Sequence, residues 1–243
     1  MYEKNIQSYL DNHGFERMDL KAVMFDMDGV LFDSMGGHVY SWVKAAKEVG
    51  LPMTDEEVYL NEGRTGNGTI NLLAQRTWGR DATESEMEEI YALKAGYFNT
   101  LPPANVMPGA PEMLNMVRDC NLGRILVTGS GQKSLLDKLD RHFPGIFTPE
   151  RMVTAFDVKM GKPYPEPYLM GLKKGELKAN EAIVVENAPL GVQAAAGAGV
   201  FTVAVNTGPL ADEVLWEAGA NVVLPDVASF AEFFPTFLQE IRR

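Results

Sequence analysis

The chain has 243 residues, 46% of them hydrophobic, and its 33 acidic side chains outnumber its 22 lysines and arginines. This length and composition suit one large globular domain or two smaller ones. The net charge of −11 argues against a nucleic-acid groove or an anionic membrane surface as a partner, because both favour basic patches. Any phosphate substrate must therefore be held by local cations.

The cysteine content and the hydrophobic runs bear on the compartment. One cysteine, Cys120, excludes an internal disulfide and fits a reducing environment. The uncharged run at residues 187–211 is long enough for a membrane span, but its Asn, Gln, Pro and Gly residues favour a helix followed by a buried strand. We therefore expect a cytoplasmic monomer without a signal peptide and without a membrane or nucleic-acid partner.

The first part of the chain predicts one buried strand and a helical insert. Residues 1–18 form an N-terminal extension with a short amphipathic helix, and the apolar run at residues 22–25 predicts a strand buried on both faces. Helical periodicity then dominates residues 36–102, where Thr54 and Thr83 begin capping boxes. We expect residues 36–102 to form a separate helical domain inserted after the first strand.

The remainder of the chain alternates strands and helices. Strands are predicted at residues 124–127, 152–153, 182–185, 201–205 and 221–224, and helices at 111–119, 134–142, 168–174, 190–198 and 230–241. This alternation predicts a parallel sheet with right-handed crossovers. Residues 1–35 and 103–243 are therefore expected to form an α/β, Rossmann-like core.

The first buried strand ends in two aspartates, Asp26 and Asp28, followed by Gly29. Side chains two residues apart in an extended chain point the same way, and open α/β sheets bind ligands at the carboxyl ends of their strands. Two carboxylates this close need a cation or a shared proton to relieve their repulsion. The pair indicates a divalent metal site or an acid/base pair, with a capping or turn role for each aspartate as the alternative.

Further polar side chains follow later strands. They are Thr128, Gly129 and Ser130 after one strand, Lys162 in a Gly-Lys-Pro turn, and Glu186 and Asn187 after another strand. Because the carboxyl ends of parallel strands meet at one edge, we expect these groups to lie together. Phosphoryl transfer uses such a set: a carboxylate nucleophile, Mg²⁺, a lysine that stabilises charge, and a second carboxylate that moves protons. Taken singly, Thr128 also fits a strand-end cap and Lys162 a solvated charge.

Four motifs in this order resemble those of the haloacid dehalogenase superfamily, specifically its β-phosphoglucomutase-like branch. They read FDMDGVLFDS at residues 25–34, VTGS at 127–130, GKPYPEP at 161–167 and VENAPLG at 185–191. The resemblance implies a Rossmann-like catalytic core. It also implies that the helical insert is a cap that closes over the site and selects the substrate.

The same resemblance implies roles for individual residues. Asp26 would be the nucleophile and Asp28 the general acid/base. The phosphoryl group would be bound by Thr128, Gly129, Ser130 and Lys162. The expected cofactor, Mg²⁺, would be bound by Asp26, the backbone carbonyl of Asp28, Glu186 and Asn187.

Two positions depart from the pattern of this branch. The fourth motif usually reads Glu-Asp, and Asn187 keeps an oxygen for Mg²⁺ but removes one negative charge. In the loop at residues 61–66, Glu62 lies near a position where the mutases carry a lysine. A carboxylate there would repel a substrate phosphate but could accept a hydrogen bond from a magnesium-bound water. This combination resembles the inorganic pyrophosphatase members of the branch; a loop carboxylate without a role is the alternative.

Three other residues of the insert are candidates for substrate binding. His38 and Lys94 match positions that the mutases use, and Arg64 could bind a phosphate. The alternatives are a helix cap for His38, a helix-surface charge for Lys94 and an ion pair between Arg64 and Glu62.

These features predict a Mg²⁺-dependent phosphohydrolase that acts through an aspartyl-phosphate. Its expected substrate is inorganic pyrophosphate or another small phosphorylated metabolite. The alternative is a β-phosphoglucomutase that interconverts β-glucose 1-phosphate and glucose 6-phosphate. A non-catalytic phosphate-sensing module is a third hypothesis, which the presence of both aspartates and Lys162 disfavours.

Overall fold

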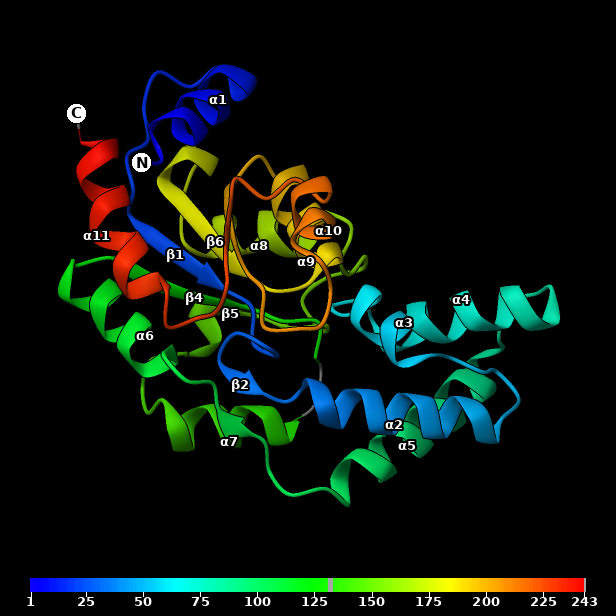
Figure 1. The fold of residues 1–243 in the computed structure, drawn as a ribbon. Coiled ribbons are helices and arrows are strands. Elements are labelled where there is room, and N and C mark those ends of the chain that lie inside the picture. Colours follow the sequence, from blue (N-terminus) through cyan, green and yellow to red (C-terminus); the bar gives the residue numbers. More distant parts are fainter. Residues whose placement is uncertain (131–132, 243) are drawn as a thin grey trace.

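In the computed structural model, which describes residues 1–130 and 133–242, parallel strands form one central six-stranded sheet (Figure 1). The spatial order is β5-β4-β1-β6-β7-β8. These strands are β1 (Ala22–Phe25), β4 (Gly123–Val127), β5 (Met152–Val153), β6 (Ala182–Glu186), β7 (Phe201–Val205) and β8 (Val222–Leu224). The predicted α/β fold with a parallel sheet is confirmed, and β1 lies between β4 and β6.

The strand register brings the candidate site residues to one edge. Phe25, the last residue of β1, pairs with Leu126 of β4 and with Val185 of β6. Because the three strands run in the same direction, the residues that follow them leave the sheet along the same edge. This is the edge at which the sequence analysis expects the site.

Helices cover both faces of the sheet, because successive side chains of a strand point to opposite sides. Val23 and Phe25 face the larger apolar core, and Met24 faces the smaller one. On the first face lie α1 (Glu3–His13), α6 (Ala110–Asp119), α7 (Lys133–His142) and α11 (Phe230–Ile241). On the second lie α8 (Glu166–Lys174), α9 (Pro189–Gly197) and α10 (Asp212–Glu217), and short 3₁₀ helices at Pro149–Arg151 and Ala179–Glu181 precede β5 and β6.

The helical insert packs around an apolar core of its own, which includes Trp42, Leu73 and Ile90. In Figure 1 it lies to the lower right of the sheet, at the end towards which the arrow of β1 points. Both predicted capping boxes form, at Thr54 and Thr83. The helices are α2 (Met35–Glu48), α3 (Asp55–Leu60), α4 (Gly66–Trp78) and α5 (Glu84–Asn99).

Two features of the structure lie outside the sequence predictions. Strands β2 (Phe32–Asp33) and β3 (Asn105–Val106) pair antiparallel where the chain leaves and re-enters the core. Each has only two residues, which is too short for a periodic pattern. Helix α10 has six residues and no capping side chain, so the sequence shows neither a long apolar face nor a cap that would predict it.

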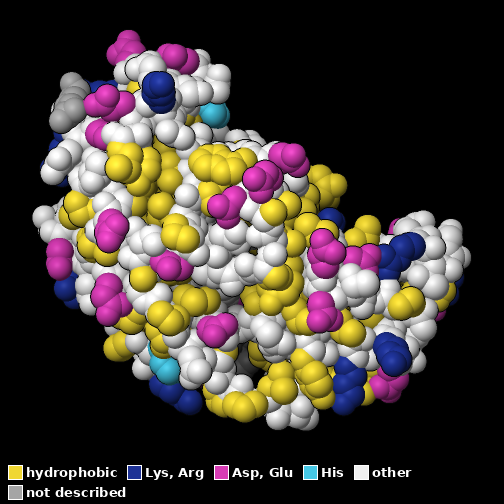
Figure 2. Space-filling model, in the orientation of Figure 1, with side chains coloured by type: hydrophobic (Ala, Val, Ile, Leu, Met, Phe, Trp, Pro, Cys, Tyr) yellow, Lys and Arg dark blue, Asp and Glu magenta, His cyan; other side chains and the backbone are white. Residues whose placement is uncertain are grey.

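Two features of the molecule bear on membrane and nucleic-acid binding. Within residues 1–130 and 133–242, no helix has the length and apolar character needed to cross a membrane. On the face shown in Figure 2, acidic side chains are scattered over the core and the insert, and the basic ones do not gather into one patch. This face therefore lacks the basic groove that a nucleic-acid backbone requires.

The aromatic packing of α11 gives a prediction about stability. Phe237 is fully buried, and the ring centroids of Phe201 and Phe233 each lie 5.1 Å from its own. Phe237→Ala should lower the free energy of unfolding by about 3–5 kcal/mol, because a cavity adds to the lost burial. Urea denaturation measures this loss. Phe156, 82% exposed, is the matched control, and Phe156→Ala should change the free energy by less than about 0.5 kcal/mol. Equal losses would contradict the assigned burial.

Candidate active site

Lys162 is the buried cation around which the site is built. Its ammonium pairs with Asp26, lies 2.6 Å from Oε1 of Glu186 and donates to the carbonyl oxygen of Val127 at 3.2 Å. An ammonium has three hydrogens, so these acceptors satisfy it completely. The side chain is only 1% exposed, so the alternative of a solvated charge is wrong. One lysine therefore joins the ends of β1, β4 and β6.

Burial and pairing act in opposite directions on this cluster. Burial raises the pKa of Asp26 above its ordinary value, Glu186 and Asp28 add to the rise, and Lys162 opposes it. Burial acts to lower the pKa of Lys162, but Asp26 and Glu186 outweigh it and hold that pKa above its ordinary value. Lys162 therefore stays charged and offsets part of the repulsion between the two carboxylates.

Glu186 is completely buried, and its carboxylate is surrounded by donors. Besides Lys162, the hydroxyl of Tyr168 donates to it at 2.6 Å, and the backbone N–H groups of Asn187 and Ala188 donate at 3.0 and 3.3 Å. A Cβ at Gly191 would lie 1.9 Å from Oε1, so glycine makes room for the carboxylate. These bonds fix Glu186 as the partner of Lys162, and the metal ligation that the resemblance implies would require it to give up some of them.

Asn187 connects the core to the insert. Its Nδ2 donates to the two carboxylate oxygens of Glu62 at 3.1 and 3.2 Å. Its Oδ1 is buried and has no hydrogen-bond partner among the residues that the structure describes. A Cβ at Gly29, whose φ is +81°, would lie 2.0 Å from Nδ2, so only glycine admits this amide. The unpaired oxygen is directed neither to Glu62 nor to solvent.

These donors were tested for their fit to a divalent cation. In the described part of the chain, no three His, Cys, Asp or Glu side chains form a metal site by themselves. The oxygens of Asp26, the backbone carbonyl of Asp28 and Oδ1 of Asn187 are hard ligands of the kind Mg²⁺ prefers, and it takes few of them from protein. A buried amide oxygen without a partner is costly unless a ligand satisfies it. The residues present therefore fit Mg²⁺, a cofactor that enzymes with these four motifs generally use.

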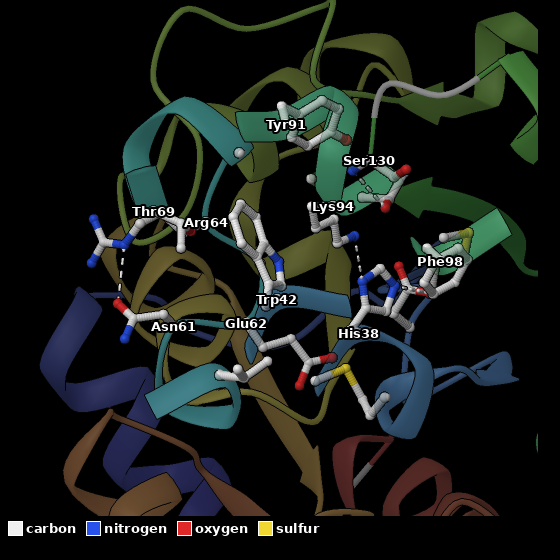
Figure 3. A pocket seen from close by; sticks show the side chains of 18 of the residues that line it. His38, Trp42, Asn61, Glu62, Arg64, Thr69, Tyr91, Lys94, Phe98 and Ser130 are labelled. Atoms are coloured by element: carbon white, nitrogen blue, oxygen red, sulfur yellow. Dashed lines mark hydrogen bonds and ion pairs between the residues drawn. The ribbon is translucent and has the colours of Figure 1, made fainter. Parts of the chain in front are cut away.

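Glu62 lies in the insert, facing this cluster. Burial raises its pKa well above the ordinary value, the charge of Asp26 adds to the rise, and the hydrogen bond from Asn187 opposes it. Arg64 does not neutralise Glu62, because its Nε donates to Oδ1 of Asn61 at 3.2 Å. Figure 3 shows the Arg64 guanidinium turned towards Asn61 and away from the Glu62 carboxylate. The expected alternative of an Arg64–Glu62 ion pair is wrong.

Asp28 is oriented by Ser34, which precedes α2, and by His38 and Lys94 of the insert. Its Oδ1 accepts a hydrogen bond from Ser34 and lies 3.4 Å from Nε2 of His38. The other ring nitrogen of His38, Nδ1, lies 3.0 Å from Nζ of Lys94, a contact drawn in Figure 3. Burial acts to raise the pKa of Asp28, but His38 and Ser34 outweigh it and lower that pKa to about 2.

Lys94 also differs from one of its expected roles. It is buried, at 3% exposed, between the rings of Trp42 and Phe98, with Nζ 5.5 and 4.9 Å from the ring centroids. Burial lowers the pKa of Lys94 to about 8. The reading of Lys94 as a helix-surface charge is therefore wrong, and the structure places it against His38 instead.

The insert sits directly on two loops of the core. A Cβ at Gly129 would lie 2.6 Å from the carbonyl oxygen of Gly63, and a Cβ at Gly161 would lie 2.6 Å from Cγ2 of Thr65. Larger residues at these two core positions would push the insert away. The glycines therefore allow the 61–66 loop to reach the strand ends.

A cavity of about 160 Å³ lies between the core and the insert. Its walls include most of the predicted site residues, namely Asp26, Asp28, Thr128, Gly129 and Ser130 of the core and His38, Glu62, Arg64 and Lys94 of the insert. Lys162 and Asn187 do not line it but contact Asp26 and Glu62, which do. The sequence analysis missed Lys138 and the aromatic wall formed by Trp42, Tyr91 and Phe98. No motif marks these residues, and only helix packing turns them towards the cavity.

Removal of the Lys162 cation tests this arrangement. Lys162→Met leaves Asp26 and Glu186 buried without a counter-charge and should lower the free energy of unfolding by about 3–5 kcal/mol. A carboxyl group whose pKa is raised by folding binds its proton more tightly in the folded state, so its contribution to stability falls as the pH rises above its ordinary pKa. The loss should therefore be larger at about pH 8 than at about pH 5.

Urea titrations in the presence of a chelator measure both values. Lys21→Met is the matched control, because Lys21 pairs with Glu181 at the surface, where an ion pair contributes about 0–1 kcal/mol. A loss for Lys162→Met as small as that of the control, or one that does not change with pH, would contradict the buried cluster.

The chain was compared with known proteins. Residues 23–205 match the family model described as haloacid dehalogenase-like hydrolase. Among curated proteins, a phosphorylated carbohydrates phosphatase of Thermotoga maritima is 30% identical over 203 residues, which cover 83% of this chain and 92% of that protein. A beta-phosphoglucomutase of Bacillus subtilis is 24% identical over 197 residues, covering 78% and 84%.

A solved structure extends the similarity over the whole chain. The protein titled a putative beta-phosphoglucomutase from Bacteroides vulgatus is 52% identical and superposes with a TM-score of 0.96, covering 100% of this chain and 98% of that one. The family match, these relatives and the cluster of carboxylates and lysine at the strand ends agree with one another. The chain belongs to the haloacid dehalogenase-like hydrolase family, as an enzyme of the phosphatase or phosphomutase type.

Proposed function

We propose that this enzyme is a Mg²⁺-dependent phosphohydrolase that acts through an aspartyl-phosphate, with inorganic pyrophosphate or another small phosphorylated metabolite as its substrate. The observation that carries the proposal is the Asn187 amide, which donates to Glu62 through Nδ2 and leaves a buried Oδ1 without a partner among the residues that the structure describes. A carboxylate from the insert thereby orients one oxygen for a cation next to the candidate nucleophile. Neither residue follows the usual pattern of the branch, and the hydrogen bonds between the two explain why both departures occur together.

The chemical roles follow from the contacts. Lys162 holds Oδ1 of Asp26, which leaves the second carboxylate oxygen free to attack phosphorus. As the bond to the leaving oxygen breaks, the protonated form of Asp28 gives that oxygen its proton and becomes a carboxylate. This carboxylate then accepts a proton from the water that hydrolyses the aspartyl-phosphate, which restores the protonated form. Thr128 stabilises the phosphoryl oxygens, Lys162 does so when one of its three acceptors gives way to a phosphoryl oxygen, and His38 orients Asp28.

The metal would be held by residues that the site leaves available. They are Asp26, the backbone carbonyl of Asp28 and Oδ1 of Asn187, whereas Glu186 keeps Lys162 in place. When bound, Mg²⁺ offsets the repulsion between a carboxylate nucleophile and an anionic phosphate.

The size and charge of the cavity support a small substrate. Its volume of about 160 Å³ is below the roughly 300 Å³ at which pockets for drug-sized ligands begin. Glu62 lies near the position at which the mutases carry a lysine, and an acidic side chain without a cationic partner there disfavours direct contact with a sugar phosphate. Pyrophosphate is compact, and a bound Mg²⁺ would offset part of its negative charge.

β-Phosphoglucomutase is the second candidate activity. The contacts of Lys94 with His38 and of His38 with Asp28 favour it, because the resemblance assigns these positions to the mutases. The experiment that separates the two compares, with Mg²⁺, phosphate release from pyrophosphate and isomerisation of β-glucose 1-phosphate primed by the bisphosphate. A larger kcat/KM for pyrophosphate supports the hydrolase, and the reverse result establishes the mutase.

The nucleophile gives a prediction that is independent of the substrate. Asp26→Asn should reduce turnover by at least about 10³-fold, because an amide does not replace a carboxylate nucleophile. Steady-state kinetics measure the loss, and far-ultraviolet circular dichroism checks that the fold is kept. Asp19→Asn, an identical change at an exposed aspartate, should leave turnover unchanged. An Asp26→Asn variant as active as that control would exclude the aspartyl-phosphate.

The Glu62–Asn187 contact gives a prediction about specificity. Glu62→Ala should lower kcat/KM for pyrophosphate by about 10-fold or more, and for p-nitrophenyl phosphate by less than about 3-fold, because the Glu62 carboxylate would accept a hydrogen bond from water on the metal that chelates the small anhydride. Glu56→Ala, at an exposed position of α3, is the control.

A double substitution tests the pairing itself. Asn187→Asp places a carboxylate against Glu62, so it should harm pyrophosphate turnover more in the native background than in Glu62→Gln, with a coupling of about 0.5–3 kcal/mol. The same cycle measured with p-nitrophenyl phosphate serves as the reference. Additive effects on pyrophosphate would show that the two residues act separately.

A further inference from the structure

Lys138 of α7 is a half-buried cation that lines the cavity, and the proposed mechanism does not use it. Its Nζ lies 3.8 Å from the centroid of the Phe32 ring. It forms no ion pair or hydrogen bond with the residues whose side chains the structure describes. The ammonium has thus lost part of its hydration and gained an aromatic face but no counter-ion.

The other cations of the cavity wall are already engaged. Lys94 contacts His38, and Arg64 donates to Asn61. Within the described part of the cavity lining, this leaves Lys138 as the cation without a polar partner. Its position on α7 also makes it part of the core and not of the insert.

Lys138 lies near Asp28, because its ammonium sits over the ring of Phe32 and Phe32 forms a β-bridge with Asp28. Burial acts to lower the pKa of Lys138 and Asp28 opposes that shift, while Lys138 is among the groups that lower the pKa of Asp28. In the proposed mechanism Asp28 protonates the leaving oxygen, so Lys138 lies on the side of the leaving group. Lys162 lies on the side of the transferred phosphoryl group.

We propose that Lys138 binds a second anionic group, carried by the leaving side of the substrate. This inference rests on the proposed phosphoryl transfer and narrows its substrate class to phosphate esters or anhydrides with a negative charge at both ends. A neutral leaving group would leave the half-buried ammonium uncompensated, whereas a second anionic group forms a charge-assisted hydrogen bond with it. Phe32 holds the ammonium in place before the ligand arrives.

Two non-hydrolysable ligands that differ by one anionic group test this proposal without any need for turnover. Methylenediphosphonate carries two phosphonates and methylphosphonate carries one. With Mg²⁺ present, calorimetric titration should show Lys138→Met weakening the binding of methylenediphosphonate by about 10-fold or more and that of methylphosphonate by less than about 2-fold. Lys138→Arg keeps the charge and should stay within about 3-fold of the native protein for both ligands.

The chain offers a matched control. Lys44 also lies over an aromatic ring, with Nζ 4.3 Å from the centroid of Tyr97, but it does not line the cavity. Lys44→Met should leave both affinities unchanged. Thermal unfolding of each variant, together with methylphosphonate binding, reports whether the fold and the phosphoryl end of the site are intact.

The outcomes separate this inference from the proposed function. A loss confined to methylenediphosphonate supports it, even if pyrophosphate turns out to be a poor substrate, and in that case only the choice of pyrophosphate fails. Equal losses for both ligands would assign Lys138 a structural role through Phe32 and overturn the inference. Unchanged affinities, or no binding of either ligand by the native protein, would overturn it as well.

Discussion

The rest of the structure depends on one buried ion cluster. Lys162 donates a hydrogen bond to one acceptor at the end of each of three neighbouring strands. These acceptors are Asp26 after β1, the carbonyl of Val127 at the end of β4, and Glu186 at the end of β6. Each of these charges would be expensive to bury alone, so each is tolerated only because the others are present. A register shift of one residue would turn a strand's side chains to the other face and break the cluster. The pairing that builds the core is therefore the same pairing that assembles the site.

The second constraint is steric, and it joins the insert to this cluster. Gly129 and Gly161 admit the backbone of Gly63 and the side chain of Thr65, and that close approach carries Glu62 to Asn187. A carboxylate delivered to this place needs a donor, because Asp26 already adds negative charge there. An aspartate at position 187 would offer none, whereas the amide donates from Nδ2 and keeps Oδ1 for a cation. The two departures from the usual motif therefore form one unit, which neither position explains alone.

Much of this arrangement was predictable from the sequence, and the exceptions have physical causes. The β1, β4 and β6 ends could be placed together because apolar strands that alternate with helices form parallel sheets, whose carboxyl ends converge. Which side chains bond to one another is harder to predict from the sequence than where each residue lies in the fold. The motif that contains Glu186 resembles a metal-binding motif, but the hydrogen bond from Tyr168 to Glu186 depends on where α8 packs. Lys94 looked equally like a surface charge, because helical spacing does not show that α2 brings His38 against it.

The distribution of charge in the cavity has a consequence for the substrate. The chain carries a net charge of −11, so a phosphate approaches against the overall field and must be held by cations fixed near the strand ends. Lys162 provides one at the end where Asp26 lies, and Lys138 provides another near Asp28. Asp26, Asp28 and Glu62 line the same cavity as Lys138, and Asn187 contacts Glu62. A ligand charged only at the end near Asp26 would leave Lys138 without a counter-ion. A compact ligand charged at both ends would supply one, which is why we favour a doubly anionic substrate over a neutral sugar as the leaving group.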